Sequence, residues 1–290
     1  MIYSINPFLA LLKDSAIAWF DDGCPKLGAA LAFYTIFSLA PVLIIAISIA
    51  GFVFGPDAAQ GHIVAQIQAL IGREAAQTVQ SMVENAHRSQ SGTVATILGF
   101  ATLLIGATAV FGELQDAFNL IWRSKPKAQN FWLTILISRL LSFSLIIAIG
   151  FLMLVSLIAS AAITAFAGYL QAVAGATGPF LSLVNSATSF VILAVLFTLL
   201  FKILPSAYVA WRDVWLGGLI TAVLFGIGKW AIGLYLGNSA IASTYGAAGS
   251  LVVLLLWIYY SAQILLFGAE FTRVHATHRN AAVNLNNPIE

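Results

Sequence analysis

The sequence is divided by long stretches that contain no charged residue. The longest runs for 62 residues between Arg139 and Lys202, and three others run for 24, 30 and 40 residues. A membrane-spanning helix needs about 20 predominantly apolar residues, so the longest stretch holds two spans. The segment 168–179 between them contains Gly and Pro and suits a turn. The pattern therefore predicts that lipid is the solvent for most of this chain.

The composition points the same way. Hydrophobic residues make up 60% of the chain and charged residues 8%, whereas soluble domains contain about 25% charged residues. A net charge of +2 offers no basic surface for nucleic acid. The single cysteine, Cys24, excludes an internal disulfide and a metal site built from cysteines. We expect an all-α integral membrane protein.

The spacing of charged and turn-forming residues predicts six transmembrane helices within one domain, 1–290. They cover residues 31–54, 93–121, 132–167, 180–203, 213–236 and 246–272. Residues 1–28 predict an amphipathic helix on the cytoplasmic interface, because Pro7 precedes an apolar helical stripe. The 55–92 loop on the outer side predicts either two short amphipathic helices or a tethered surface loop. Residues 274–290 form a polar cytoplasmic tail.

The distribution of Lys and Arg predicts the orientation. Nine of these residues fall in the segments that would share one side with the two termini, and only Arg73 and Arg88 fall in the 55–92 loop on the opposite side. Cytoplasmic loops carry an excess of Lys and Arg. Both termini are therefore predicted to be cytoplasmic.

Three charged residues lie inside the second and third predicted spans. Gly99, Gly106 and Glu113 recur every seven residues, which places Glu113 on a glycine stripe that faces another helix. Asp116 shares that side, and Arg139 lies at a similar depth on the next predicted helix. Such charges usually face protein or water. They predict either a polar path or a charge cluster that only holds two helices together.

Lys229 is the fourth charged residue within a predicted span. It follows Gly226 and precedes Gly233 and Gly237, so the stripe predicts helix packing around a buried lysine. A lysine there could bind an anionic headgroup or substrate, or carry a proton. Alternatively, its stem extends to the outer surface and the charge stays in water.

No recognisable catalytic pattern occurs in the sequence. The histidines are scattered, and His275 and His278 lie in a polar segment that favours a solvated pair over a metal site. There is no nucleotide-binding glycine loop and no nucleophile elbow. We expect no enzymatic activity, no catalytic residue, no metal and no cofactor.

Two blocks of the sequence resemble the YihY/BrkB family of bacterial inner-membrane proteins. They are "GAALAFYTIFSLAPVLIIAISIAG" from residue 28 and the distal motifs "LPSAYVAWRDVWLGG" and "STYGAAGSLVVLLLWIYYSAQILLFGAEFTR". The resemblance implies a multi-pass protein of the inner (plasma) membrane with six helices. It also implies that family function or folding concentrates at Pro41, Pro205, Trp211, Arg212, Asp213, Tyr245, Gly246, Trp257, Gly268 and Glu270. One member carried the label ribonuclease BN, but the sequence has neither metal ligands nor a basic groove for that activity.

Two functions remain in competition at this point. A transporter or lipid-moving permease would use the buried charges and the glycine-interrupted helices for a small-molecule or lipid substrate. A non-transporting protein for structure or envelope maintenance would use the same charges to lock the bundle. Membrane lipids are the partners expected in either case, and the glycine stripes are compatible with a homo-oligomer.

Overall fold

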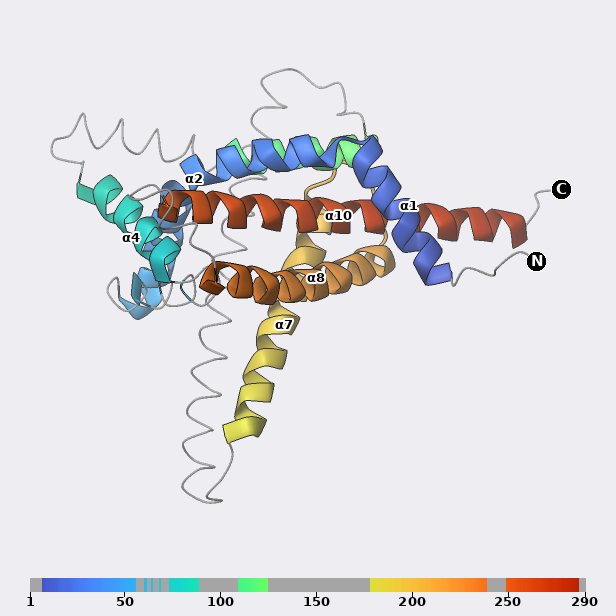
Figure 1. The fold of residues 1–290 in the computed structure, drawn as a ribbon. Coiled ribbons are helices and arrows are strands. Elements are labelled where there is room, and N and C mark those ends of the chain that lie inside the picture. The colour runs from blue at the N-terminus through green and yellow to red at the C-terminus, as the bar shows by residue number, and fades with distance from the viewer. Residues whose placement is uncertain are drawn as a thin grey trace.

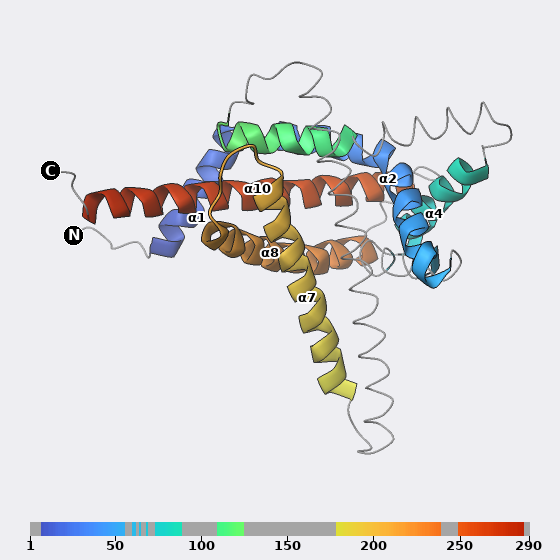
Figure 2. The ribbon, with the colours of Figure 1, turned by 180° about the vertical axis from the view of Figure 1, so that it is seen from behind.

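The computed structural model describes residues 7–55, 60–61, 64, 68, 73–88, 109–124, 178–238 and 249–286, and the regular structure within these ranges is helical. Helices α2 (Cys24–Phe54), α8 (Trp211–Asn238) and α10 (Gly249–Asn286) run side by side (Figure 1). Helix α1 (Pro7–Asp21) crosses α10 toward its C-terminus, and α4 (Arg73–Arg88) packs near its N-terminus. Helix α7 (Gly178–Ile203) crosses α8 at a steep angle (Figure 2).

In the part of the chain that the structure describes, three helices are long and apolar enough to cross a membrane. The segments are Ser186–Ile203, Trp211–Ile232 and Leu251–Arg279, and α1 with the first part of α2 would add a fourth if that bent pair is one span. The described residues thus confirm a helical protein with three to four candidate spans. The predicted helix 132–167 and most of 93–121 lie outside the described residues, so six spans and cytoplasmic termini remain predictions.

Two helices extend beyond the predicted spans into segments that contain charged residues. Helix α2 begins at Cys24 rather than at residue 31, and α10 continues through the predicted tail as far as Asn286. Hydropathy locates the lipid-soluble part of a helix and carries no information about how far the helix extends into water. The extension of α10 packs against α1, where Leu11, Phe271 and Val274 form a small apolar cluster.

The bend between α1 and α2 has a local cause in the sequence. Gly23 adopts φ 67° and ψ 25°, a left-handed conformation that glycine tolerates without a Cβ clash. Pro25 follows in the first turn of α2, where a proline needs no hydrogen-bond partner. The two helices consequently meet at 67°, with Asp22 and Cys24 at the corner.

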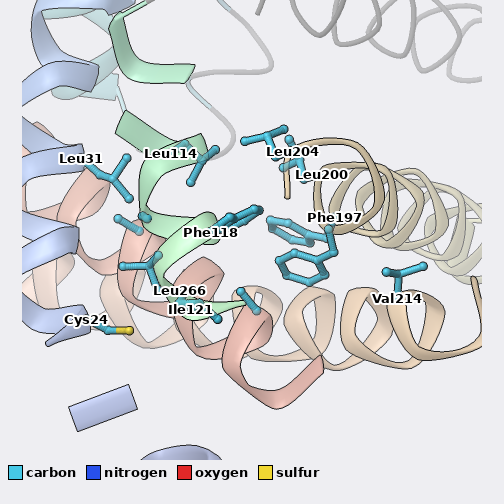
Figure 3. Packing of buried hydrophobic residues seen from close by; sticks show 14 of the residues in the cluster. Cys24, Leu31, Leu114, Phe118, Ile121, Phe197, Leu200, Leu204, Val214 and Leu266 are labelled. Atoms are coloured by element: carbon cyan, nitrogen blue, oxygen red, sulfur yellow. The ribbon is translucent and has the colours of Figure 1, made fainter. Parts of the chain in front are cut away.

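The main core joins five elements near this corner. It contains Phe118 and Ile121 of the helical segment 109–121, Phe201 of α7 and Leu266 of α10, all fully buried. Figure 3 shows Phe118, Ile121 and Leu266 within this core. The Phe118 and Phe201 rings lie 5.7 Å apart between centroids. In lipid, close packing of this kind stabilises helix contacts more than burial from water does. The core therefore fixes the positions of the charged side chains next to it.

Helix α4 packs with one apolar face on the opposite end of the bundle. Val79 and Val83 are buried against Leu43 of α2 and Leu254 of α10, whereas Gln77 is exposed. The helix lies within the loop for which the sequence predicted amphipathic helices or a tethered loop. Its apolar face joins the end of α2 to the beginning of α10.

Candidate functional site at the charged end of the bundle

The last part of α10 carries charged side chains that reach three other elements. Helical spacing places Glu270, Arg273, His275, His278 and Arg279 around one stretch of the helix. Their partners are aspartates of α1, of the α1–α2 corner and of α8. We refer to Asp22, Asp213 and these five residues of α10 as the charged end.

Two carboxyl groups meet at a single guanidinium group. Arg273 donates from Nε and Nη2 to Glu270 Oε2 at 2.9 and 2.7 Å, and its Nη2 lies 3.5 Å from Asp22 Oδ2. The Glu270 side chain is fully buried, and Arg273 and Asp22 are 17% and 14% exposed. A second cation, Arg123, lies 3.9 Å from Asp22 Oδ1 but is 74% exposed and consequently screened by solvent. Arg273 is thus the main positive charge that compensates this buried acidic pair.

Asp213 forms the second part of the charged end. It lies in the first turn of α8, where a negative charge interacts favourably with the helix dipole. Its Oδ1 accepts a hydrogen bond from Arg279 Nη1 at 2.8 Å and lies 3.2 Å from His275 Nδ1. The Asp213 side chain is 2% exposed, so the guanidinium group of Arg279 compensates a buried charge and joins α8 to α10.

Helix α1 makes a third contact with α10 at the same end. His278 Nε2 lies 3.3 Å from Asp14 Oδ2, and both side chains are about half exposed. An exposed pair of this kind contributes little stability. The apolar contacts of Leu11 with Phe271 and Val274 hold α1 across α10 more firmly.

Several buried polar atoms on α2 and α10 have no hydrogen-bond partner among the described residues. They are Ser38 Oγ of α2 and Ser261 Oγ, Gln263 Oε1, Glu270 Oε1 and His275 Nδ1 of α10. A buried polar group without a partner is costly, and more so where lipid replaces water. Gln263 also reaches the first turn of α2, where its Nε2 lies 3.5 Å from the Pro25 carbonyl oxygen. These unpartnered polar atoms thus lie on two helices that pack against each other.

Of the predicted cluster of Glu113, Asp116 and Arg139, the structure describes only the two carboxylates. Glu113 is half-buried and Asp116 is exposed, and neither forms an ion pair within the described ranges. Arg139 lies outside the described residues, as do Gly99 and Gly106. The proposed cluster remains a prediction.

Two residues of the predicted packing stripe on α8 are Gly226 and Lys229. Both are exposed, and no described atom lies within 4 Å of a Cβ built on Gly226. Gly226 follows the buried Gly218 by eight residues, which turns Gly226 about 80° away from it around the helix. The buried face is centred on Val214, Gly217, Thr221 and Gly228. Gly233 and Gly237 are part of α8.

Other glycines provide the close helix contacts. A Cβ on Gly28 would lie 2.0 Å from Gln263 Nε2, one on Gly218 would lie 2.2 Å from Thr198 Oγ1, and one on Gly268 would lie 1.9 Å from Thr221 Oγ1. Each therefore allows a polar side chain of the neighbouring helix to approach the backbone. This is the small-residue packing expected between membrane helices, at positions other than Gly226.

The residues singled out by the family motifs fall into different surroundings. Asp213 and Glu270 belong to the charged end, Pro205, Trp257 and Gly268 are buried, and Trp211 and Arg212 are exposed. Pro41 lies within α2, and Tyr245 and Gly246 lie outside the described residues. The three-residue spacing of Glu270 and Arg273 on one helix indicates that they pair, whereas the sequence analysis gave Asp22 no role. The only feature of the sequence that points to Asp22 is its position just before Gly23 and Pro25.

Within the described ranges, no group of three or more His, Cys, Asp or Glu side chains could hold a metal ion. The charged end instead offers paired carboxylates, two histidines and the guanidinium groups of Arg273 and Arg279. These groups can bind charged or polar ligands and can exchange protons.

Comparisons with known proteins place the chain in a family. The model of the family described as virulence factor BrkB matches residues 18–288. A UPF0761 membrane protein of Ralstonia nicotianae is 29% identical over 262 residues, which cover 86% of this chain and 55% of that protein. One from Verminephrobacter eiseniae is 31% identical over 256 residues, with coverages of 84% and 57%.

The chain spans a little over half the length of the curated relatives it matches. No solved structure matches it. Because the family model covers nearly the whole chain and the relatives are named as membrane proteins, this chain is a membrane protein that belongs to the BrkB family.

Proposed function

We propose that the protein is a permease of the bacterial inner membrane that moves a small molecule or a lipid. The polar path in this proposal begins at the charged end and follows α2 and α10. This path differs from the one that Lys229 suggested, because Lys229 is exposed on α8. The proposal assigns binding and movement to these residues and no covalent chemistry.

The observation that carries the proposal is the set of unpartnered buried polar atoms on α2 and α10. Ser38, Ser261, Gln263 and Glu270 each bury at least one oxygen without a partner among the described residues. A bundle with only a structural role is stabilised by pairing or removing such groups. A substrate or water moving along the helices would supply the missing hydrogen bonds.

The positions of basic residues support a cytoplasmic charged end. Lys and Arg gather there and at the turns beside it, whereas α4 at the opposite end carries Arg73 and Arg88. The residues on the charged side are Lys13, Lys26, Arg123, Lys202, Arg212, Arg273 and Arg279. By the positive-inside rule, a substrate would meet the charged end from the cytoplasm.

A non-transporting structural role is the second candidate. The observation in its favour is the tight contact of α8 with its neighbours, where Thr198 and Thr272 reach within 2.2 Å of Cβ positions built on glycines of α8. Such close packing is suited to a rigid assembly. It would also be suited to the fixed half of a transporter.

Thiol accessibility distinguishes these two roles. In a Cys24→Ala background, single cysteines replace Ser38 and Ser261, and inside-out vesicles are treated with a membrane-impermeant thiol reagent. Position 38 lies roughly 21 Å along α2 from Cys24, so the reagent reaches it only through a hydrated path. We expect labelling of both cysteines, measured by the mass shift of the protein.

Two control positions calibrate this experiment. The controls are Leu254→Cys and Leu219→Cys. Leu254 is 1% exposed within an apolar cluster, and Leu219 lies on an exposed apolar face of α8. Both should be protected, since neither lies on the path. Protection of positions 38 and 261 in folded protein would contradict the permease proposal and favour the structural role.

A further inference from the structure

We propose that the turn between α7 and α8 binds the phosphate headgroup of an anionic phospholipid. The binding surface consists of Lys202, Tyr208, Trp211, Arg212 and Trp215, and we call it the basic–aromatic turn. The proposal concerns the surface that meets the lipid leaflet. It is independent of whether the protein transports anything.

Contacts with neighbouring groups fix the position of the Lys202 side chain. No carboxylate among the described residues forms an ion pair with it. Its Nζ donates a hydrogen bond to the Val209 carbonyl oxygen and lies 4.6 Å from the centroid of the Tyr208 ring and 5.4 Å from that of Trp211. Ring faces attract the ammonium group without neutralising it, and two of its protons remain for other acceptors. The arrangement thus presents a positioned cation.

The rings around this cation are exposed to an unusual degree. Tyr208 is 91% exposed, Trp211 53% and Trp215 48%. Such amphipathic rings are enriched where a membrane protein meets the headgroup region. Their exposure next to a lysine fits a surface that contacts lipid headgroups and upper acyl chains.

Arg212 adds a second positive charge to the same turn. It is exposed and forms no ion pair within the described ranges. The adjacent carboxylate, Asp213, is buried and engaged by Arg279 on the α10 side. The field outside the turn is therefore positive, although an acidic residue follows Arg212 directly.

The aromatic residues of α8 also indicate the depth of the turn in the membrane. Trp211 and Trp230 are 53% and 68% exposed and lie near opposite ends of the candidate span Trp211–Ile232 within α8. Their separation in sequence corresponds to roughly 28 Å of helix, close to the hydrocarbon thickness of about 30 Å. With Trp230 at one interface, the basic–aromatic turn lies at the other, where phosphate groups are found.

The chemistry of the surface favours an anionic lipid over a zwitterionic one. Lys and Arg form charge-assisted hydrogen bonds with phosphate oxygens. In phosphatidylglycerol the phosphodiester charge is not offset by a cation of the same headgroup. In phosphatidylcholine the quaternary ammonium offsets that charge and would approach two like charges. Attraction to an anionic leaflet amounts to about 1 kcal/mol per basic residue, or a factor of about five in affinity.

The test measures lipid binding to the purified full chain in detergent. Native mass spectrometry compares phosphatidylglycerol and phosphatidylcholine with identical acyl chains, using Arg212→Gln and Tyr208→Ala. Both side chains are exposed, so neither substitution removes a buried contact. We expect wild type to prefer phosphatidylglycerol and Arg212→Gln to bind it about fivefold more weakly. Lys229→Gln is the control, because it removes one exposed charge of α8 far from the turn.

Three results would overturn the proposal. One is equal binding of the two lipids by wild type. Another is an equal loss in Arg212→Gln and Lys229→Gln, which would reflect net charge rather than the turn. The third is full competition by inorganic phosphate at the lipid concentration, since the surface would then bind a free anion. Retained preference in Lys229→Gln together with its loss in Arg212→Gln and Tyr208→Ala supports the lipid site.

Discussion

Replacement of Arg273 by alanine is expected to destabilise the protein by about 3–5 kcal/mol, because it leaves a buried acidic pair without its main counter-charge. Glu270 is fully buried and receives two hydrogen bonds from Arg273, whose Nη2 also lies 3.5 Å from Asp22. The measurement is the free energy of unfolding in mixed detergent micelles titrated with a denaturing detergent. A loss of this size is a large part of the stability of an ordinary domain.

Arg123→Ala is the matched control for this prediction. Arg123 also approaches Asp22, but at 3.9 Å and with 74% of its side chain exposed. We expect a change of at most about 1 kcal/mol, as for other exposed ion pairs. If the two alanine substitutions cost the same, the charged end does not depend on Arg273 in the way its geometry indicates.

The same prediction about Arg273 can be checked in a variant whose two buried carboxylates are neutral. Asp22→Asn and Glu270→Gln together remove the carboxylate charges that Arg273 compensates. In that background Arg273→Ala should cost much less than in wild type, since no buried anion is left behind. An undiminished cost would mean that Arg273 stabilises the protein through packing of its aliphatic part.

Gly218→Ala is expected to destabilise the contact between α7 and α8 by about 1–3 kcal/mol, the usual range for overpacking. A Cβ at this position would lie 2.2 Å from Thr198 Oγ1 and 2.9 Å from both the Ala194 carbonyl oxygen and the Thr198 nitrogen. The helices must separate, because two of these atoms belong to the backbone. Thermal unfolding in detergent, followed by circular dichroism, measures the effect.

Two further glycine substitutions test whether steric overlap of the added Cβ causes the loss of stability. Gly226→Ala should change stability by less than about 1 kcal/mol, since no described atom lies within 4 Å of the added Cβ. At Gly217 the nearest atoms all belong to the Thr272 side chain. Thr272→Ala should consequently rescue Gly217→Ala in part, whereas Thr198→Ala should rescue Gly218→Ala less. Equal losses at 218 and 226 would contradict the observed packing face.

Sequence reasoning located much of the helical framework because charge-free stretches have the length that lipid requires. The predicted segment 213–236 corresponds to Trp211–Asn238, and 180–203 corresponds to Gly178–Ile203. It could not determine which face of α8 packs, because a stripe of small residues allows several rotations of a helix and only the neighbours select one. For this reason the predicted packing glycines include Gly226 and do not include Gly217 or Gly228.

The charged end was less accessible to sequence reasoning. Asp22, Glu270 and Arg273 come together only because α1 and α2 bend at Gly23 and α2 then packs along α10. Hydropathy indicates which segments meet lipid and says nothing about which segments meet each other. The pairing of Glu270 with an arginine was predictable because the two lie on one helical turn, as the 2.7 Å contact with Arg273 shows.

The contact between the α1–α2 corner and α10 also constrains how the protein is made. Pro25 and Gln263, which meet there, are separated by 238 positions in the chain. At synthesis rates of about 5–20 residues per second, Asp22 enters or approaches the membrane on the order of tens of seconds before Arg273 exists. During that interval the Asp22 carboxylate and the Pro25 carbonyl oxygen are without the contacts that Arg273 and Gln263 of α10 provide. The early helices therefore reach the membrane before the segment that completes their polar contacts exists, and the final packing of this corner has to wait for α10.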